Sequence, residues 1–304
     1  MTCRKLILVL IVVSLFIKQS HSQAYFLPPS DQLRKDRLNK VVWTETAILA
    51  VTSIGLYYLW YKKFPKSRFH LFNDRHEWMQ IDKVGHAATA YNISAMQYDL
   101  LRWCGVKQHD AILSSSLTSL AYMSIIEIMD GFSKEWGFSS YDMLANISGT
   151  ALFAAQQYGW NEQRIGLKAS ARFTPFAKES KSLLGHNWAS RLMKDYNGQT
   201  YWLTFNLRSF LPVNSDVPTW LNLSVGYGAE GMLRAKKNIP DTMYKNYNSQ
   251  RYRQFYFAPD ADLFRIPGNG AMQSTFYLTK FLKTPAPAIE FNSKRKIKLH
   301  AIYF

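Results

Sequence analysis

The sequence predicts an α+β protein: an N-terminal bundle of about four hydrophobic helices, then a mostly antiparallel, one-sided β-sheet with short helices. Apolar residues come in helix-length runs up to about residue 160 and alternate with polar residues beyond it. The charge changes at the same place. Residues 1–160 carry 16 Lys and Arg against 12 Asp and Glu, whereas residues 161–304 carry 21 against 9. We therefore predict a signal peptide at 1–22, a helical domain at 23–160 and a basic, strand-rich domain at 161–304.

The first 22 residues have the pattern of a secretory signal. Arg4 and Lys5 precede an unbroken apolar run from Leu6 to Ile17, and small residues come just before Gln23. The alternative is a signal anchor that stays attached, but the apolar run is shorter than the ~20 residues that span a bilayer. We expect an exported protein of the bacterial cell envelope, associated with the membrane on the periplasmic side or at the outer membrane.

The predicted helices follow in order. Val41 to Tyr61 has Glu45 as its single charge and is long enough to cross a bilayer, so we expect a transmembrane helix there. Val84 to Val106, Ala111 to Met129 and Tyr141 to Tyr158 are helix-length but contain polar residues. Such residues are tolerated in a membrane when they face protein or a wet cavity. The pattern thus fits either a membrane-embedded bundle or a soluble four-helix bundle.

The second part alternates with period two, which is typical of half-buried strands. We predict strands at 165–173, 201–208, 221–228, 255–263 and 297–303, and short helices at 187–196 and 272–283. Asn197 and Gly198 form a tight-turn signal before the second strand. We expect a curved sheet whose apolar face rests on the helices or on lipid.

Polar residues collect in the helical part, where the interior of a bundle should be. Asp82 and His86 are four residues apart and share a helix face, and Glu127 and Asp130 are three apart at the end of another helix. Asp142 opens the last helix, four residues before Asn146 and three after Ser139, which can cap that helix.

These residues form the series Asp-Lys-x-Gly-His, Glu-x-x-Asp-Gly and Gly-Phe-Ser-x-x-Asp-x-x-x-Asn-x-x-Gly, from Asp82 to Gly149. The series resembles the YfiM-like family of predicted periplasmic lipoproteins of unknown function. It is similar, more distantly, to VanZ-like membrane proteins with four hydrophobic helices. The resemblance implies an envelope location and no settled reaction. No cysteine follows the signal segment as in the lipoproteins, so Val41 to Tyr61 would hold this chain to the membrane.

The polar cluster has two interpretations. In the first, His86 is a general base or a metal ligand with Asp82, Glu127, Asp130 and Asp142 as its partners. With a divalent metal the same set could activate water against a phosphate or an ester. In the second, the residues satisfy one another as a buried network that fixes the register of the helices. The pattern specifies neither a metal nor a cofactor.

Three functions stay open at this point. The first hypothesis is a membrane-associated envelope protein that acts as a structural or interaction module. The second is a metal-assisted or acid–base hydrolase or transferase that acts on an envelope lipid. The third is an outer-membrane protein whose sheet pairs with a barrel partner.

The sequence also limits the partners. Cys3 and Cys104 are the only cysteines, which excludes a disulfide framework and a zinc ribbon. The Lys and Arg residues of the basic part are scattered rather than grouped in a block. We therefore expect membrane lipid, an anionic envelope surface or another envelope protein as partner, and no nucleic acid.

Overall fold

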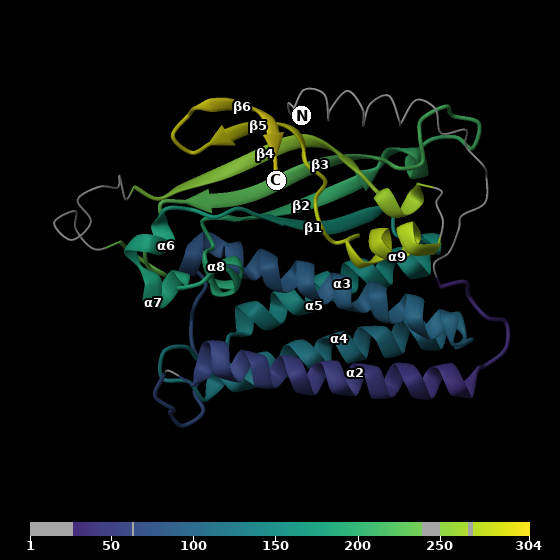
Figure 1. Cartoon of the computed structure of the whole chain (residues 1–304), viewed down its shortest axis with the longest axis horizontal. Helices are drawn as coiled ribbons and strands as arrows, with labels where there is room; N and C mark the ends of the chain where they lie inside the picture. Colours follow the sequence, from purple (N-terminus) through teal and green to yellow (C-terminus); the bar gives the residue numbers. More distant parts are fainter. Residues whose placement is uncertain (1–26, 63, 239–249, 267–269) are drawn as a thin grey trace.

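The computed structural model describes residues 27–62, 64–238, 250–266 and 270–304 (Figure 1). The predicted signal peptide at 1–22 lies outside the described residues. The described chain forms two layers, with the long helices in one and a curved sheet in the other.

All four predicted helices are present. They are α2 (Lys35–Leu56, continued by a π-helical turn at Tyr57–Tyr61), α3 (Ile81–Trp103), α4 (Gln108–Gly131) and α5 (Ser140–Trp160). The predicted transmembrane helix at Val41 to Tyr61 is not supported. Among the described helices, α4 alone is long and apolar enough to cross a membrane, and α2 does not meet that criterion.

The interior of the bundle contains polar residues as well as an apolar cluster of Tyr91, Ala95, Ile112 and Phe153. Ser94, Ser115 and Ser119 are buried between the helices, and the Ser119 hydroxyl of α4 donates to the Ala90 carbonyl of α3 over 2.8 Å. A hydrogen bond to a helix carbonyl lets a serine hydroxyl be buried without losing its partner. The apolar side chains that a soluble bundle would place inside are therefore partly displaced to its outer faces.

The six strands form an antiparallel meander in chain order. They are β1 (Ile165–Ala171), β2 (Gln199–Asn206), β3 (Leu221–Glu230), β4 (Tyr252–Ala261), β5 (Ala286–Asn292) and β6 (Ile297–Tyr303). Five of them match predicted strands. β5 was not predicted because it contains Pro287, which lies where the pairing with β6 shifts register between Ala286 and Ala288. A proline is tolerated in a sheet at such a bulge, because it has no N–H to donate there.

The apolar face of the sheet is covered only in part, and the polar face is buried. Leu167 and Tyr201, on the apolar face, pack against α3, which confirms the expected contact between sheet and bundle for β1 and β2. Farther along the same face, Phe255 and Phe257 are exposed. The opposite face is the buried one, and there the Lys168 ammonium pairs with Asp260 at 2.7 Å.

The buried face is closed by the curl of the sheet. Trp202, Tyr256 and Tyr303 form a buried aromatic cluster from β2, β4 and β6. A hydrogen bond of 2.9 Å joins the hydroxyl groups of Thr200 and Tyr303, although four strand-to-strand steps separate β2 from β6.

Shorter elements cover the ends of the sheet. α6 (Phe176–Glu179), α7 (Lys181–Leu184) and α8 (Trp188–Lys194) lie beside the start of α3, and α9 (Gly270–Leu278) lies at the other end (Figure 1). α8 and α9 match the two predicted short helices. The group α6 to α8 places residue Tyr196 over the end of the bundle where the polar residues meet.

Candidate functional site

The first turn of α3 is set up by an unusual backbone conformation. Trp78, Met79 and Gln80 all have positive φ angles, of 46°, 51° and 65°. This left-handed region costs residues other than glycine roughly 1–2 kcal/mol each. The Met79 carbonyl accepts hydrogen bonds from the Tyr227 hydroxyl and the Arg253 guanidinium of the sheet. The sheet thus holds the strained turn that aims the start of α3.

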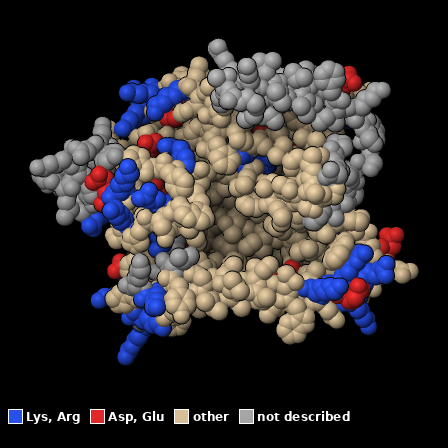
Figure 2. All heavy atoms as spheres, in the orientation of Figure 1, with Lys and Arg blue, Asp and Glu red and all other residues tan. Residues whose placement is uncertain are grey.

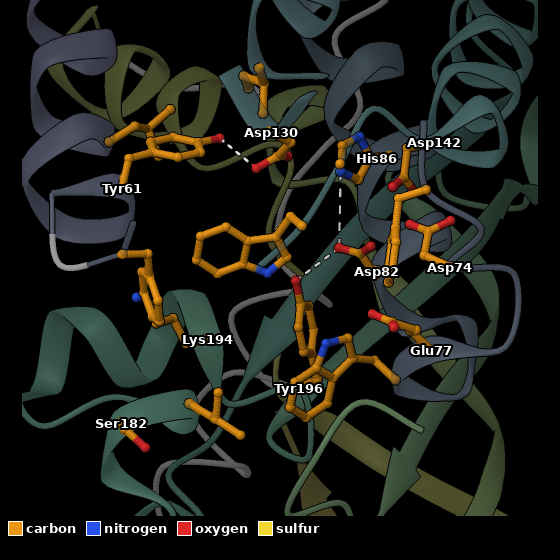
Figure 3. Close-up of a pocket in the computed structure, with 18 residues that line it drawn as sticks. Tyr61, Asp74, Glu77, Asp82, His86, Asp130, Asp142, Ser182, Lys194 and Tyr196 are labelled. Carbon is orange, nitrogen blue, oxygen red and sulfur yellow. Dashed lines mark hydrogen bonds and ion pairs between the residues drawn. The ribbon is translucent and has the colours of Figure 1, made fainter. Parts of the chain in front are cut away.

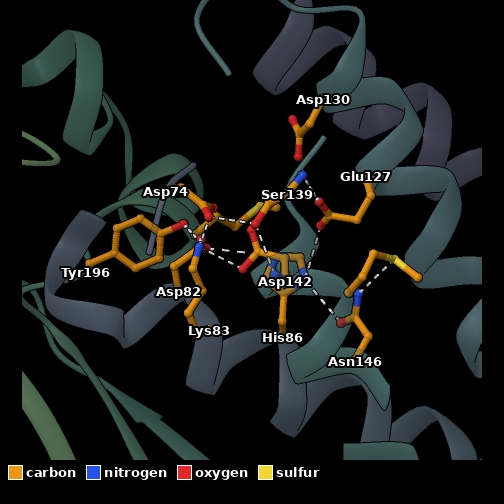
Figure 4. Close-up of polar contacts among 12 residues, drawn as sticks. Asp74, Asp82, Lys83, His86, Glu127, Asp130, Ser139, Asp142, Asn146 and Tyr196 are labelled. Atoms are coloured by element: carbon orange, nitrogen blue, oxygen red, sulfur yellow. Dashed lines mark hydrogen bonds and ion pairs between the residues drawn. The ribbon is translucent and has the colours of Figure 1, made fainter. Parts of the chain in front are cut away.

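His86 lies at the centre of the polar residues (Figure 4). Its Nδ1 is 3.1 Å from Asn146 Oδ1 on α5 and 3.5 Å from Glu127 Oε1 on α4. Its Nε2 is 3.9 Å from Asp82 Oδ1, one turn earlier on α3. With the Asn146 oxygen as acceptor, Nδ1 carries the ring proton and Nε2 has a free lone pair.

A second group lies beside His86 and is centred on Lys83. The Lys83 ammonium contacts the carboxylates of Asp74, Asp82 at 3.1 Å and Asp142 at 2.8 Å. The Ser139 hydroxyl donates to Asp74 over 2.6 Å and accepts from the Asp142 amide, so it caps α5 as predicted. Figure 4 shows these residues converging from α3, from the start of α5 and from the loop before α3.

Burial alters the protonation of the carboxyl groups. Burial, with the charges of Asp142 and Asp130, raises the pKa of Glu127 to about 8. Burial also raises the pKa of Asp130 to about 7, although the Tyr61 hydroxyl donates to it over 2.8 Å. Near neutral pH, Glu127 therefore holds a proton in most molecules and Asp130 is close to half-protonated.

Asp74 and Asp142 act as a pair. Burial, together with the charge of Asp82, raises the pKa of Asp142. Burial opposes ionisation of Asp74 as well, but hydrogen bonds from Asp142, Lys83 and Ser139 lower its pKa overall. Burial alone would lower the pKa of Lys83, yet Asp82 and Asp142 raise it. The pair therefore shares a proton that lies on Asp142, next to a charged lysine.

Two cavities open at this site. One is about 190 Å³ and is lined by carboxyl and aromatic side chains (Figure 3). The other is about 310 Å³ and more apolar. Asp82, His86 and Tyr196 line both, and the Tyr196 hydroxyl donates to Asp82 Oδ1 over 2.8 Å. His86 therefore lies where the two cavities meet.

Three residues of the site form a grouping of the kind that binds divalent metals. Asp82, His86 and Asp142 have donor atoms within 4.8 Å of one another, a grouping that a metal ion could use. However, the Lys83 ammonium already contacts both of these aspartates. A metal would have to displace this cation, whereas acid–base chemistry at His86 requires no rearrangement.

The structure brings the five sequence-predicted site residues to one end of the bundle. Asp82 and His86 lie on α3, Glu127 and Asp130 on α4, and Asp142 on α5. Their catalytic role stays a prediction.

Sequence reasoning missed three neighbours: Asp74, Tyr61 and Tyr196. Asp74 lies in a loop without periodicity. The two tyrosines follow segments whose place in space depends on the tertiary fold, so no local signal could have identified them.

Residues 71–158 match the family model described as "Predicted periplasmic lipoprotein (DUF2279)". The match contains the whole motif series from Asp82 to Gly149 and spans less than a third of the chain. No curated protein and no solved structure gives a match. The chain is therefore similar, in its helical part, to periplasmic envelope proteins of unknown function, which agrees with the expected cell-envelope location.

Proposed function

We propose that this chain is a membrane-associated envelope protein whose helical part is an acid–base hydrolase or transferase for an envelope lipid. The observation that carries the proposal is the position of His86. Its Nδ1 is held by Asn146, its Nε2 faces Asp82, and both His86 and Asp82 line the two cavities. A network with a purely structural role would not need a histidine nitrogen on a cavity wall.

The geometry supports a simple sequence of proton transfers. His86 Nε2 takes the proton from a water molecule or a substrate hydroxyl, whose oxygen attacks the phosphorus or carbonyl carbon of the lipid. The resulting imidazolium lies beside Asp82 Oδ1, whose negative charge stabilises it, while Glu127 on the other side of the ring stays protonated and neutral. It then returns the proton to the leaving oxygen, so His86 ends in its starting state.

The outer faces of the helices support the association with a membrane. No exposed residue is charged between Val42 and Ile54 of α2, Leu113 and Ile128 of α4, or Leu144 and Tyr158 of α5. We call this surface the apolar belt. Its large exposed side chains are Val42, Trp43, Ile48, Val51, Ile54, Leu113, Leu117, Ile125, Ile128, Leu144, Ile147 and Tyr158.

Basic residues border the apolar belt at both ends. Arg34, Lys35, Lys40 and Lys107 are exposed at one end, and Lys62, Lys66, Arg68 and Lys134 at the other. Figure 2 shows Lys and Arg gathered at the two lower corners of the molecule, with an uncharged band between them. This distribution fits hydrocarbon along the belt and anionic head groups at its ends.

A second candidate is the structural or interaction module. The observation in its favour is that the same contacts join separate parts of the chain. Lys83 links α3 to α5 through Asp142, and Asp82 accepts a hydrogen bond from Tyr196, beyond α8. In this case the cluster would hold the helices and the sheet in register, with no turnover.

The test replaces His86 by Gln and Glu127 by Gln, singly and together, in the full chain. The exposed His109→Gln, at the other end of the bundle, is the matched control. Thermal stability and envelope lipid composition are measured on the same strains. The enzyme proposal predicts folded variants with an altered lipid profile. Unfolded variants, or folded variants with an unchanged profile, would favour the structural module instead.

A further inference from the structure

We infer that the cavity pair takes an amphipathic molecule with an ammonium head group, such as a phosphatidylethanolamine-type lipid, with the head in the smaller cavity and an acyl chain in the larger. This inference rests on the proposed function, because it names the substrate class of the same site. Four observations support it: the charge of the smaller cavity, its aromatic walls, the apolar second cavity and the position of His86 between them.

The smaller cavity is acidic in a chain whose formal net charge is +16. Five carboxyl side chains line it, against one lysine, Lys194. They are Asp74, Glu77, Asp82, Asp130 and Asp142. Directly behind His86, Glu127 is 1% exposed, and its Oε1 has no hydrogen-bond partner among the described residues. Lys83 offsets the charge of Asp74 and Asp82, and Lys236 lies 3.7 Å from Glu77. Asp130 contacts the Tyr61 hydroxyl and, among the described residues, no lysine or arginine, so the place beside Asp130 favours a cationic ligand.

Aromatic rings form much of the remaining wall. Trp136 packs against Tyr61 and Phe64, with ring centroids 6.0 Å and 4.7 Å away, and Trp78 packs against Tyr196 at 5.1 Å. All five rings line the smaller cavity. Ammonium groups bind to the faces of such rings, most strongly to tryptophan. A bare divalent metal ion prefers oxygen ligands and would gain little from this wall.

The second cavity matches the other half of an amphipathic molecule. Met123, Ile126, Leu192 and Met193 line it. Methionine side chains are flexible and adapt to acyl chains of different shape. Met123 and Ile126 belong to α4, whose outer face is part of the apolar belt, and Leu192 and Met193 belong to α8. A lipid could therefore place its tail here while its head lies among the carboxyl groups.

The two cavities share Asp82, His86, Ile126 and Tyr196. In a lipid bound across both, the phosphodiester that joins head and tail would lie beside His86 Nε2. In this arrangement the acid–base site would act on the phosphodiester between the head group and the tail.

The experiment uses the full chain in a non-ionic detergent. Soluble dihexanoyl-phosphatidylethanolamine and dihexanoyl-phosphatidylglycerol, which differ only in the head group, are compared by titration calorimetry, with MgCl2 and ZnCl2 as separate titrants. We expect the ethanolamine lipid to bind at least about tenfold more tightly than the glycerol lipid. Equal binding of the two lipids, or tight binding of metal with no lipid binding, would overturn the inference.

Variants locate the binding site. Glu77→Gln with Asp130→Asn removes two carboxylates from the smaller cavity while keeping the shape of both side chains. We expect this pair to weaken ethanolamine-lipid binding about tenfold. Asp110→Asn, an exposed carboxylate at the other end of the bundle, should leave binding unchanged. Unchanged binding in the double variant would overturn the inference, and a thermal melt of each variant establishes that it is folded.

His86→Gln separates this inference from the proposed function. If the variant keeps lipid affinity but its strain has a lipid profile different from that of the wild-type strain, both the inference and the enzyme proposal stand. If lipid binds as expected but His86→Gln leaves the profile unchanged, the inference stands as a lipid-binding site and the enzyme proposal fails. If the profile depends on His86 but the head group does not affect binding, the enzyme proposal stands and the ammonium inference fails.

Discussion

At the scale of single residues, the burial of Glu127 makes the stability of the fold depend on pH. The folded state raises its pKa from the ordinary 4.5 to about 8, mainly through burial. A carboxyl group with a raised pKa stabilises the fold fully below its unfolded value, and that stability is lost as the pH rises through the folded value. The glutamine in Glu127→Gln does not ionise, so the variant does not lose this stability as the pH rises. We expect its melting temperature to equal that of the wild type below pH 4.5 and to exceed it by several degrees above pH 8.

Thermal melts across this pH range check the prediction. The side-chain oxygen of the glutamine in Glu127→Gln can still accept the hydrogen bond that the Ser139 amide donates to Glu127 Oε2 over 3.2 Å, so the variant keeps the cap of α5. Asp110→Asn serves as the control, because its side chain is 63% exposed and its removal should shift all melts equally. A melting-temperature difference that does not change with pH would show that Glu127 ionises as it does in water.

Sequence alone could predict most of this site but not its full charge balance. Asp82, His86, Glu127, Asp130 and Asp142 lie on helices, and helix spacing showed which of them share a face. Which helix faces meet depends on tertiary packing. Spacing therefore did not reveal that Lys83 pairs with the acids on two sides, nor that the loop residue Asp74 completes the group.

The backbones of α3 and α5 lie in close contact at Gly149. A Cβ atom at Gly149 would lie 2.0 Å from the Ala87 carbonyl oxygen, which is helix backbone and has no room to yield. Gly149→Ala should therefore force the two helices apart and destabilise the fold by about 1–3 kcal/mol. The shift would also separate His86 from Asn146, so, if the enzyme proposal holds, activity should fall together with stability.

Gly159, on the same helix, provides the matched control. A Cβ atom there would meet nothing within 4 Å. Gly159→Ala should be neutral or stabilising by up to about 1 kcal/mol, because alanine is the better helix former. Chemical denaturation of both variants compares them directly. Equal effects at the two positions would mean that helix propensity, and not the contact with Ala87, determines the result.

The difference between local propensity and tertiary contact also explains which elements were predictable from the sequence. Helices α2 to α5 and five strands followed from local periodicity, which depends only on neighbouring residues. The sequence did not predict β5, because Pro287 is unfavourable in a strand unless a bulge accommodates it. A bulge depends on the partner strand, which local sequence does not specify. The sequence did not predict the left-handed turn at Trp78 to Gln80 for a similar reason, because contacts from β3 and β4 stabilise it.

Across the whole molecule, both layers bury many polar side chains and leave large apolar side chains exposed. The bundle buries Ser115, Ser119 and Asn146 and exposes Leu117 and Ile128. The sheet likewise buries its polar face. Hydrophobic periodicity shows that a helix or strand has an apolar side, but not whether that side faces protein or lipid. The sequence therefore left a soluble bundle and a membrane-associated one as alternatives.

The apolar belt provides the test that decides between them. If the belt lies against hydrocarbon, a lysine at Leu117, which is 57% exposed, would carry a charge into the bilayer at a cost of roughly 2.5–3.5 kcal/mol. We expect the full chain to float with phosphatidylethanolamine/phosphatidylglycerol vesicles on a density gradient and to resist a high-salt wash. Leu117→Lys should shift a substantial fraction of it to the soluble layer.

Val213→Lys is the matched control for this substitution. Val213 is more exposed, at 87%, but it lies in the loop between β2 and β3, away from the apolar belt. The same gain of charge there should leave flotation unchanged, so a difference between the variants reports the location of the charge and not its presence. If both variants float like the wild type, the belt does not contact hydrocarbon, and the basic ends alone hold the protein to the membrane. In that case the high-salt wash should release the wild type too, because attraction to anionic head groups is screened within about 10 Å at 0.1 M salt and within less at higher concentration.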